Sequence, residues 1–185
     1  FIVGDMPFGS YHTSDGEAVA NAVRFLKESN VDAIKLEGGV RVTSKIKAIA
    51  DAGIVVIGHI GLTPQSAGQL GGFKAQGLRV DSARALIDDA LAVQEAGALA
   101  LLLEAVPPGA GLPCDGQLII CGDMLGMFQA FTPKFVKKYA NVAEVITNAF
   151  KEYIEDVKIE KFPEDKHAYH IKDSLDDFKK LFQEY

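Results

Sequence analysis

Short apolar runs alternate with amphipathic stripes along most of the chain. The apolar runs predict β-strands at Phe1–Gly4, Val31–Leu36, Ile54–Ile57, Ala98–Leu103 and Leu118–Cys121. Stripes with the i, i+3, i+4, i+7 spacing of a helix predict α-helices at Glu17–Ser29, from Val42 to Gly53, from an N-cap at Ser82 to Gly97, at Val142–Val157 and at Ser174–Tyr185. Strands that alternate with helices and are apolar throughout are typical of a parallel sheet with both faces buried.

Ionisable residues follow five of these strands, at or just beyond their carboxyl ends. They are Asp5, Glu37, His59, Glu104 and Asp123. An open doubly wound sheet and a closed barrel both fit the alternation, but a barrel brings the carboxyl ends of its strands to one face. We therefore expect an α/β fold of the (β/α)8 TIM barrel class, with these five side chains on that face.

The barrel expected from the pattern is incomplete. Five strands are three short of the eight that close a TIM barrel. No helix is predicted between Leu103 and Leu118, although a parallel crossover needs about a dozen residues and usually a helix. We expect one barrel domain over residues 1–185 with C-terminal helices, interrupted by an apparent gap at Pro108–Gly109. Because the chain opens on Phe1 inside an apolar run, we also expect it to be part of a longer polypeptide.

Composition excludes several other classes of protein. The formal net charge of −6 argues against non-specific nucleic-acid binding, which needs a basic face. No apolar stretch reaches the roughly 18 residues that a membrane-spanning helix requires. Two cysteines are too few for a disulfide framework or a zinc site and are typical of a protein in a reducing cytosol. We expect a cytoplasmic protein without a nucleic-acid or membrane partner.

Several segments, in order along the chain, resemble the ketopantoate hydroxymethyltransferase family. They are Asp5–Tyr11, Lys35–Gly39, Gly58–Gln65, Gly71–Gly77, Leu103–Pro107, Gly109–Gly111 with Cys114–Gln117, and Phe162–Pro163 with His167. Each motif is short, but their order over Asp5–His167 is specific. The family also has barrel strands and a metal-binding Asp before the first segment, and a helix and a strand before Gly109–Gly111. These two departures coincide with the defects in the strand pattern.

The resemblance implies a reaction. Members of the family transfer a hydroxymethyl group from 5,10-methylenetetrahydrofolate to 3-methyl-2-oxobutanoate, which gives 2-dehydropantoate (ketopantoate) for pantothenate and coenzyme A synthesis. The addition is aldol-like and passes through an enolate that Mg²⁺ stabilises as a Lewis acid. The cofactors implied are Mg²⁺ and the folate cosubstrate, and the assembly implied is a homo-oligomer, commonly a decamer.

The same resemblance gives roles to the strand-end residues. Asp5 matches a residue that binds metal and substrate, and Glu37 a further acidic group at the metal. Lys35 matches a substrate-binding lysine; it stands two residues before Glu37 and so shares its strand face. Glu104 matches the general base, and the apolar strand before it should raise the pKa of its carboxyl group. His59 is a second catalytic candidate, with a hydrogen-bonded structural histidine as its alternative role.

Two other functions stay open on sequence grounds. One is a metal-enolate barrel enzyme of the phosphoenolpyruvate mutase/isocitrate lyase type, although the cysteine-bearing catalytic loop of that group is not found here. The other is a non-catalytic barrel relic that serves as a binding or assembly subunit. An intact mass near 19.9 kDa would favour the relic, and a mass several kilodaltons higher would favour the enzyme.

Overall fold

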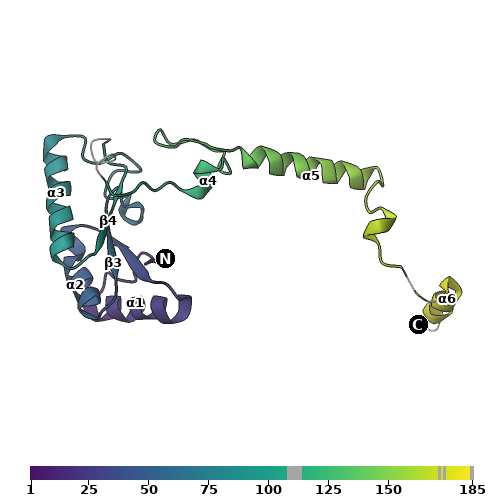
Figure 1. Ribbon diagram of the computed structural model, residues 1–185, viewed down its shortest axis with the longest axis horizontal. Helices are drawn as coiled ribbons and strands as arrows, with labels where there is room; N and C mark the ends of the chain where they lie inside the picture. Colours follow the sequence, from purple (N-terminus) through teal and green to yellow (C-terminus); the bar gives the residue numbers. More distant parts are fainter. Residues whose placement is uncertain (108–113, 171, 173, 184–185) are drawn as a thin grey trace. The chain divides into compact units, whose positions relative to one another are not determined.

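The chain divides into two compact units, Phe1–Gln117 and Leu118–Tyr185. The computed structural model describes residues 1–107, 114–170, 172 and 174–183 (Figure 1). The apparent gap expected at Pro108–Gly109 lies outside the described residues. The single barrel domain over residues 1–185 stays a prediction.

A parallel four-stranded sheet forms the first unit, in the order β1-β2-β3-β4. Its strands are β1 (Val3–Asp5), β2 (Ala33–Glu37), β3 (Val56–Gly61) and β4 (Ala100–Glu104). The helices between them are α1 (Asp15–Ser29), α2 (Thr43–Asp51) and α3 (Val80–Glu95), with short 3-10 turns η1 (Val40–Val42) and η2 (Pro64–Ser66). Each strand pairs with the next one along the chain, so the predicted α/β class and the parallel sheet are confirmed.

One face of this sheet is apolar and covered by the three helices (Figure 1). Side chains of Ile34, Leu36, Val56 and Ile60 from the strands share one buried core with Ala18, Ala22, Ile46, Ile49 and Val93 from the helices. Gly4 belongs to this face, where a Cβ atom would lie 2.6 Å from the ring of Phe25 in α1. The close approach of β1 and α1 therefore depends on the missing side chain.

Helix boundaries follow local capping chemistry. The side chain of Ser14 accepts a hydrogen bond from the Glu17 N–H and so caps α1, which ends at Asn30 in the left-handed region (φ 52°). The predicted N-cap at Ser82 is wrong. Helix α3 begins at Val80, and the Ser82 hydroxyl accepts from the N–H of the N-cap residue Arg79. A serine at the third helical position can accept a hydrogen bond from the N–H of the N-cap residue. The sequence pattern does not distinguish this role from that of an N-cap serine.

Among its described residues, the second unit has helices joined by irregular connections. It contains α4 (Cys121–Met124), α5 (Val142–Lys158), the 3-10 turn η4 (Asp165–His167) and α6 (Leu175–Gln183). The strand predicted at Leu118–Cys121 is wrong: the Ile120 carbonyl oxygen accepts from the N–H groups of Asp123 and Met124 and so begins α4. An apolar run becomes a strand only where a neighbouring strand takes its backbone hydrogen bonds, and among the described residues none does so here.

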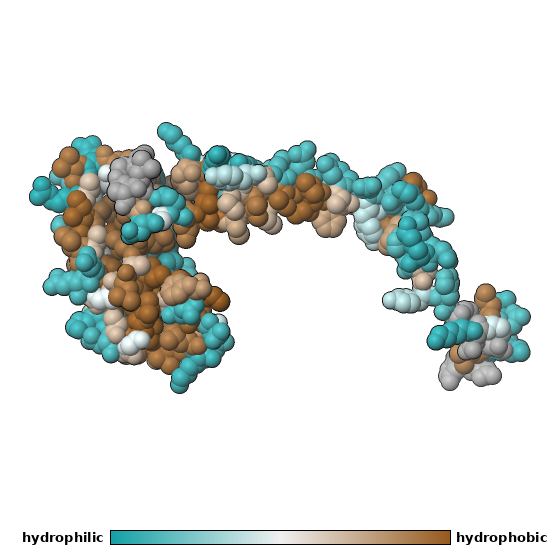
Figure 2. Space-filling view, viewed as in Figure 1, coloured by the Kyte–Doolittle hydropathy of each residue, from teal (hydrophilic) through white to brown (hydrophobic). Residues whose placement is uncertain are grey.

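Helix α5 carries the apolar stripe that the sequence predicts, and Figure 2 shows apolar residues along it. Beyond α5, the ring of Phe162 lies 5.6 Å from that of Tyr153 and 5.1 Å from that of His167. These ring contacts join the C-terminal motif residues to α5. No helix among the described residues is long and apolar enough to cross a membrane.

Candidate active site

The register of the parallel sheet brings the predicted site residues to the face that the helices leave uncovered. Asp5 is paired with Lys35, Glu37 with His59, and Gly61 with Glu104. Because side chains alternate along a strand, Asp5, Lys35, Glu37, His59 and Glu104 all point to the same side of the sheet. The predicted convergence on one side of the sheet is therefore confirmed for Asp5, Glu37, His59 and Glu104, and Lys35 shares the strand face of Glu37 as expected.

Lys35 is at the centre of this group. Its Nζ atom lies 2.7 Å from Asp5 Oδ1, 3.2 Å from His59 Nδ1 and 3.9 Å from Glu37 Oε1. An ammonium group carries three donors, and these three acceptors surround it. The Lys35 side chain is only 15% exposed, so the charge is neutralised by carboxylates rather than by bulk water.

His59 connects Lys35 to Glu104 and is almost fully buried. Because an ammonium group only donates, Nδ1 must accept from Lys35, which leaves the proton of a neutral ring on Nε2. Nε2 lies 3.1 Å from Glu104 Oε2, but the atoms are not aligned for a hydrogen bond and Nε2 has no other partner among the described residues. A buried N–H group is thus available beside the Glu104 carboxylate.

Glu104 is the last residue of β4, and two backbone hydrogen bonds hold the chain in place there. The Leu62 N–H donates to the Glu104 carbonyl oxygen at 2.8 Å, and the Gln76 N–H donates to the Ala105 carbonyl oxygen at 2.8 Å. Ala105 adopts a left-handed conformation (φ 48°) that non-glycine residues seldom take. The Glu104 carboxylate is 36% exposed, so it is held at the edge of the site and still reaches solvent.

Glu37 is buried and has a different partner for each carboxylate oxygen. Oε2 accepts a hydrogen bond from the Gln65 N–H at 3.0 Å, whereas Oε1 forms an ion pair with Lys35 Nζ at 3.9 Å and lies 3.5 Å from His59 Nδ1. Gln65 and the fully buried Tyr11 also bond to each other. The sequence interpretation gave neither residue a role, although a tyrosine inside an apolar core needs a partner for its hydroxyl group.

The residues present fit a magnesium ion that is completed by a substrate. Among the described residues there is no cluster of three or more His, Cys, Asp or Glu side chains that could hold a metal by itself. Asp5 and Glu37, however, come from neighbouring strands and both face the same cation, the Lys35 ammonium group. Mg²⁺ is commonly held by one or two carboxylates together with substrate oxygens and waters, so two acidic residues are sufficient.

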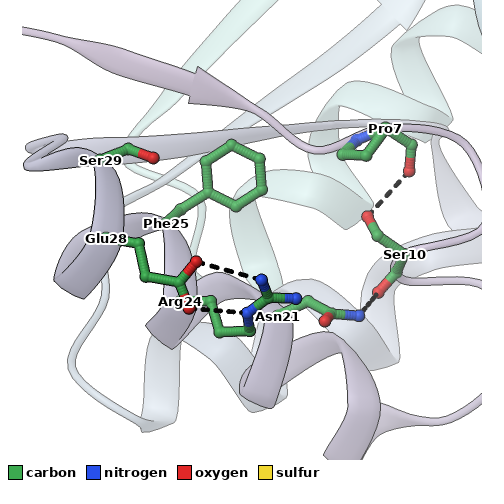
Figure 3. A pocket seen from close by; sticks show the side chains of 7 residues that line it. All are labelled: Pro7, Ser10, Asn21, Arg24, Phe25, Glu28 and Ser29. Carbon is green, nitrogen blue, oxygen red and sulfur yellow. Dashed lines mark hydrogen bonds and ion pairs between the residues drawn. The ribbon is translucent and has the colours of Figure 1, made fainter.

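Among the described residues, at least two cavities lie in the first unit. One, of about 180 Å³, is lined in part by Gly38, Gly61, Gln76 and Asp89. Of these, Gly38 directly follows the site residue Glu37. A second, of about 230 Å³, lies between α1 and the β1–α1 loop (Figure 3). Neither cavity is lined by Asp5, Lys35, Glu37, His59 or Glu104. The site is therefore defined by the contacts among its side chains rather than by a cavity.

A family model described as ketopantoate hydroxymethyltransferase matches residues 1–108 and 108–165. The chain belongs to this family. The family resemblance inferred from the motifs is thus confirmed, and the matched range includes all five residues of the site.

Three curated proteins, each named 3-methyl-2-oxobutanoate hydroxymethyltransferase, are similar over almost the whole chain. The one from Alkaliphilus metalliredigens (strain QYMF) is 67% identical over 202 residues, which cover 100% of this chain and 71% of that protein. The one from Clostridium beijerinckii is 48% identical, with 98% of this chain and 71% of that protein covered. The one from Desulfotalea psychrophila is 48% identical, with 91% and 67% covered.

The outcome for Asp123 differs from that for the other four strand-end candidates. It lies in α4 of the second unit rather than after a strand. The expectation of a fifth strand-end residue is therefore wrong at this position, because it depended on the strand predicted at Leu118–Cys121. Four ionisable strand-end residues and Lys35 make up the candidate site.

Proposed function

We propose that this chain transfers a hydroxymethyl group from 5,10-methylenetetrahydrofolate to 3-methyl-2-oxobutanoate and so forms 2-dehydropantoate. The observation that carries the proposal is the single polar face on which Asp5, Lys35, Glu37, His59 and Glu104 form one connected group. Membership of the ketopantoate hydroxymethyltransferase family supports the same reaction.

In this proposal Lys35, Asp5 and Glu37 bind the 2-oxo acid and its metal. The Lys35 ammonium group attracts the substrate carboxylate, and the more than half-exposed Asp5 carboxylate is accessible to a ligand. Asp5 and Glu37 would hold Mg²⁺. When bound, the ion supplies Lewis-acid stabilisation of the negative charge that develops on the keto oxygen.

Glu104 is proposed as the general base. It takes the proton from carbon 3 of the 2-oxo acid, and the electrons of the broken C–H bond move into the enolate. Carbon 3 then forms a bond to the one-carbon unit of the folate as the first of the two C–N bonds of that unit breaks. Water displaces the second nitrogen and supplies the hydroxyl oxygen. The two nitrogens of the released tetrahydrofolate take up the proton held by Glu104 and one proton of the water. The His59 Nε2–H group beside Glu104 is proposed to orient the new hydroxymethyl group by donating a hydrogen bond.

We also propose that the parallel sheet is part of a (β/α)8 barrel with its site on the carboxyl-terminal face. The sequential order β1-β2-β3-β4 and the polar inner face support a barrel. An interruption near residue 108 is supported by two family-model segments that meet there and by an alignment of 202 residues for a chain of 185. The cytoplasmic location and the homo-oligomeric, decameric assembly are further predictions.

The test is product formation by the purified protein. We expect 2-dehydropantoate to form from 3-methyl-2-oxobutanoate and 5,10-methylenetetrahydrofolate with Mg²⁺ present, and not with EDTA. Mass spectrometry identifies the product, and Glu104→Gln serves as the inactive control. Protein that binds the 2-oxo acid without turnover would support the non-catalytic relic. Turnover of phosphonopyruvate or isocitrate instead would support the phosphoenolpyruvate mutase/isocitrate lyase alternative.

A further inference from the structure

The two carboxylate oxygens of Glu37 face different parts of the structure. Oε2 accepts from the backbone N–H of Gln65 in the β3–α3 loop at 3.0 Å. Oε1 points into the site, 3.9 Å from Lys35 Nζ and 3.5 Å from His59 Nδ1. The side chain is only 4% exposed, so water does not compete strongly for either oxygen. One oxygen is thus anchored and the other is directed towards the ligand site.

Gln65 is itself held by both ends of its side-chain amide. Its Oε1 atom accepts from the Tyr11 hydroxyl at 2.8 Å, and its Nε2 atom donates to the Met6 carbonyl oxygen at 2.9 Å. The opposite amide orientation would place two acceptor oxygens against each other at Met6. The amide therefore has one satisfied orientation, and that orientation ties the β3–α3 loop to the residue after Asp5.

Tyr11 closes the network on Glu37. Its hydroxyl oxygen accepts from the Glu37 backbone N–H at 3.2 Å while its proton goes to Gln65, at a shorter distance than the 3.3 Å to the Glu37 carbonyl oxygen. The ring is fully buried, and that burial raises the pKa of Tyr11 to about 12. The hydroxyl group thus stays protonated and remains a donor through neutral pH.

We infer that Tyr11 and Gln65 are positioning residues that direct a single oxygen of Glu37 into the ligand site. Among the described residues, neither side chain has a hydrogen bond or ion pair to Lys35 or Glu104, so they act through Glu37. The inference rests on the proposed function, in which Glu37 holds the metal. Residues that orient a metal-binding carboxylate commonly change metal affinity by about 10- to 100-fold when they are removed.

Asn21 of α1 offers a matched control, because its side chain binds the same β1–α1 loop. Its side-chain amide donates to the Ser10 carbonyl oxygen at 2.7 Å, a part-buried hydrogen bond that holds the loop next to Tyr11 (Figure 3). Asn21 lines the cavity outside the site and has no bond to Glu37 among the described contacts. Its removal loosens the loop without touching the proposed network.

The first experiment measures binding of Mn²⁺, used as a probe for Mg²⁺, by electron paramagnetic resonance with 3-methyl-2-oxobutanoate present. Tyr11→Phe and Gln65→Met should each weaken Mn²⁺ binding about 10- to 100-fold. Asn21→Ala should bind Mn²⁺ as tightly as the wild type does, even if its melting temperature falls as far as that of Tyr11→Phe or Gln65→Met. The double variant should be hardly weaker than either single one, because both remove the same hydrogen bond. Wild-type affinity in both single variants would overturn the inference.

A second measurement needs no metal and separates this inference from the proposed function. Hydrogen exchange of the Gln65 amide, followed by NMR, reports its bond to Glu37 Oε2. Exchange should be at least about tenfold faster in Tyr11→Phe than in wild type or Asn21→Ala. An unchanged exchange rate overturns the inference. Wild-type protein that binds no Mn²⁺ but shows the faster exchange in Tyr11→Phe would instead contradict the metal site in the proposed function.

Discussion

Replacing Lys35 by methionine removes the ammonium group that Asp5, Glu37 and His59 share while retaining a side chain of similar length. Glu37 is then left buried, and the Gln65 N–H is the remaining hydrogen-bond donor to its carboxylate among the described residues. Removing one partner of a fully buried ion pair costs about 3 to 5 kcal/mol, whereas an exposed pair contributes about 1 kcal/mol or less. Here Asp5 is 56% exposed and Glu37 lies 3.9 Å away, so an intermediate loss of about 2 kcal/mol is expected.

Lys45 supplies the comparison. Its Nζ lies 3.1 Å from Asp15 Oδ1, and its side chain is 20% exposed beside a carboxylate that is 50% exposed. The Lys35–Asp5 pair has nearly the same exposures, 15% and 56%. The difference is that, among the described residues, Lys45 has no ion pair with a buried carboxylate such as Glu37. Lys45→Met should therefore lose clearly less stability than Lys35→Met.

Urea denaturation at pH 7 without divalent cations measures both losses as changes in the free energy of unfolding. The slope with urea should stay constant, and the midpoint of Lys35→Met should fall further than that of Lys45→Met. The 2-oxo acid should also bind more weakly to Lys35→Met. Equal stability losses in the two variants would refute the reasoning that Lys35 balances the buried charge of Glu37.

Three further outcomes are expected. Asp5→Ala should abolish Mg²⁺-dependent product formation with an unchanged circular dichroism spectrum, because Asp5 is half-exposed at a strand end; full activity with EDTA present would contradict the metal site. Gly61→Ala should lower the free energy of unfolding by about 1 to 3 kcal/mol, because φ is +91° and a Cβ would lie 2.3 Å from the Glu104 carbonyl oxygen; a wild-type melting temperature would contradict this. Burial raises the pKa of Tyr11 from 10.0 to about 12, so the stabilisation from its protonated hydroxyl group is present below pH 10 and is lost as the pH rises through about 12. Between these pH values, the free energy of unfolding of the wild type should fall by about 2 to 3 kcal/mol more than that of Tyr11→Phe, and equal slopes with pH would contradict the shift.

The sequence predicts the first unit well because its elements depend on local signals. The stripes of α1, α2 and α3 and the apolar runs of β1 to β4 all appear within a few residues of their expected ranges. The strand at Leu118–Cys121 could not be decided in this way. Whether such a run pairs in a sheet depends on a neighbouring strand elsewhere in the chain, and periodicity does not report the presence of that neighbour.

The site was predictable where its residues stand at strand ends. Asp5, Glu37 and Glu104 each close a strand, and the alternation of side chains places Lys35 beside Glu37. Tyr11 and Gln65 were not predictable in the same way. They lie in loops, and their contacts with Glu37 depend on the three-dimensional paths of two connections.

Proton removal from carbon 3 of 3-methyl-2-oxobutanoate tests the central claim most directly. NMR follows it as deuterium incorporation in D₂O with Mg²⁺ and without folate. Glu104→Gln keeps the size and shape of the base and removes its proton acceptor, so exchange should fall about 10²- to 10⁴-fold with the affinity for the 2-oxo acid changed much less. Exchange at the wild-type rate in Glu104→Gln would contradict the account and make His59 the next residue to examine.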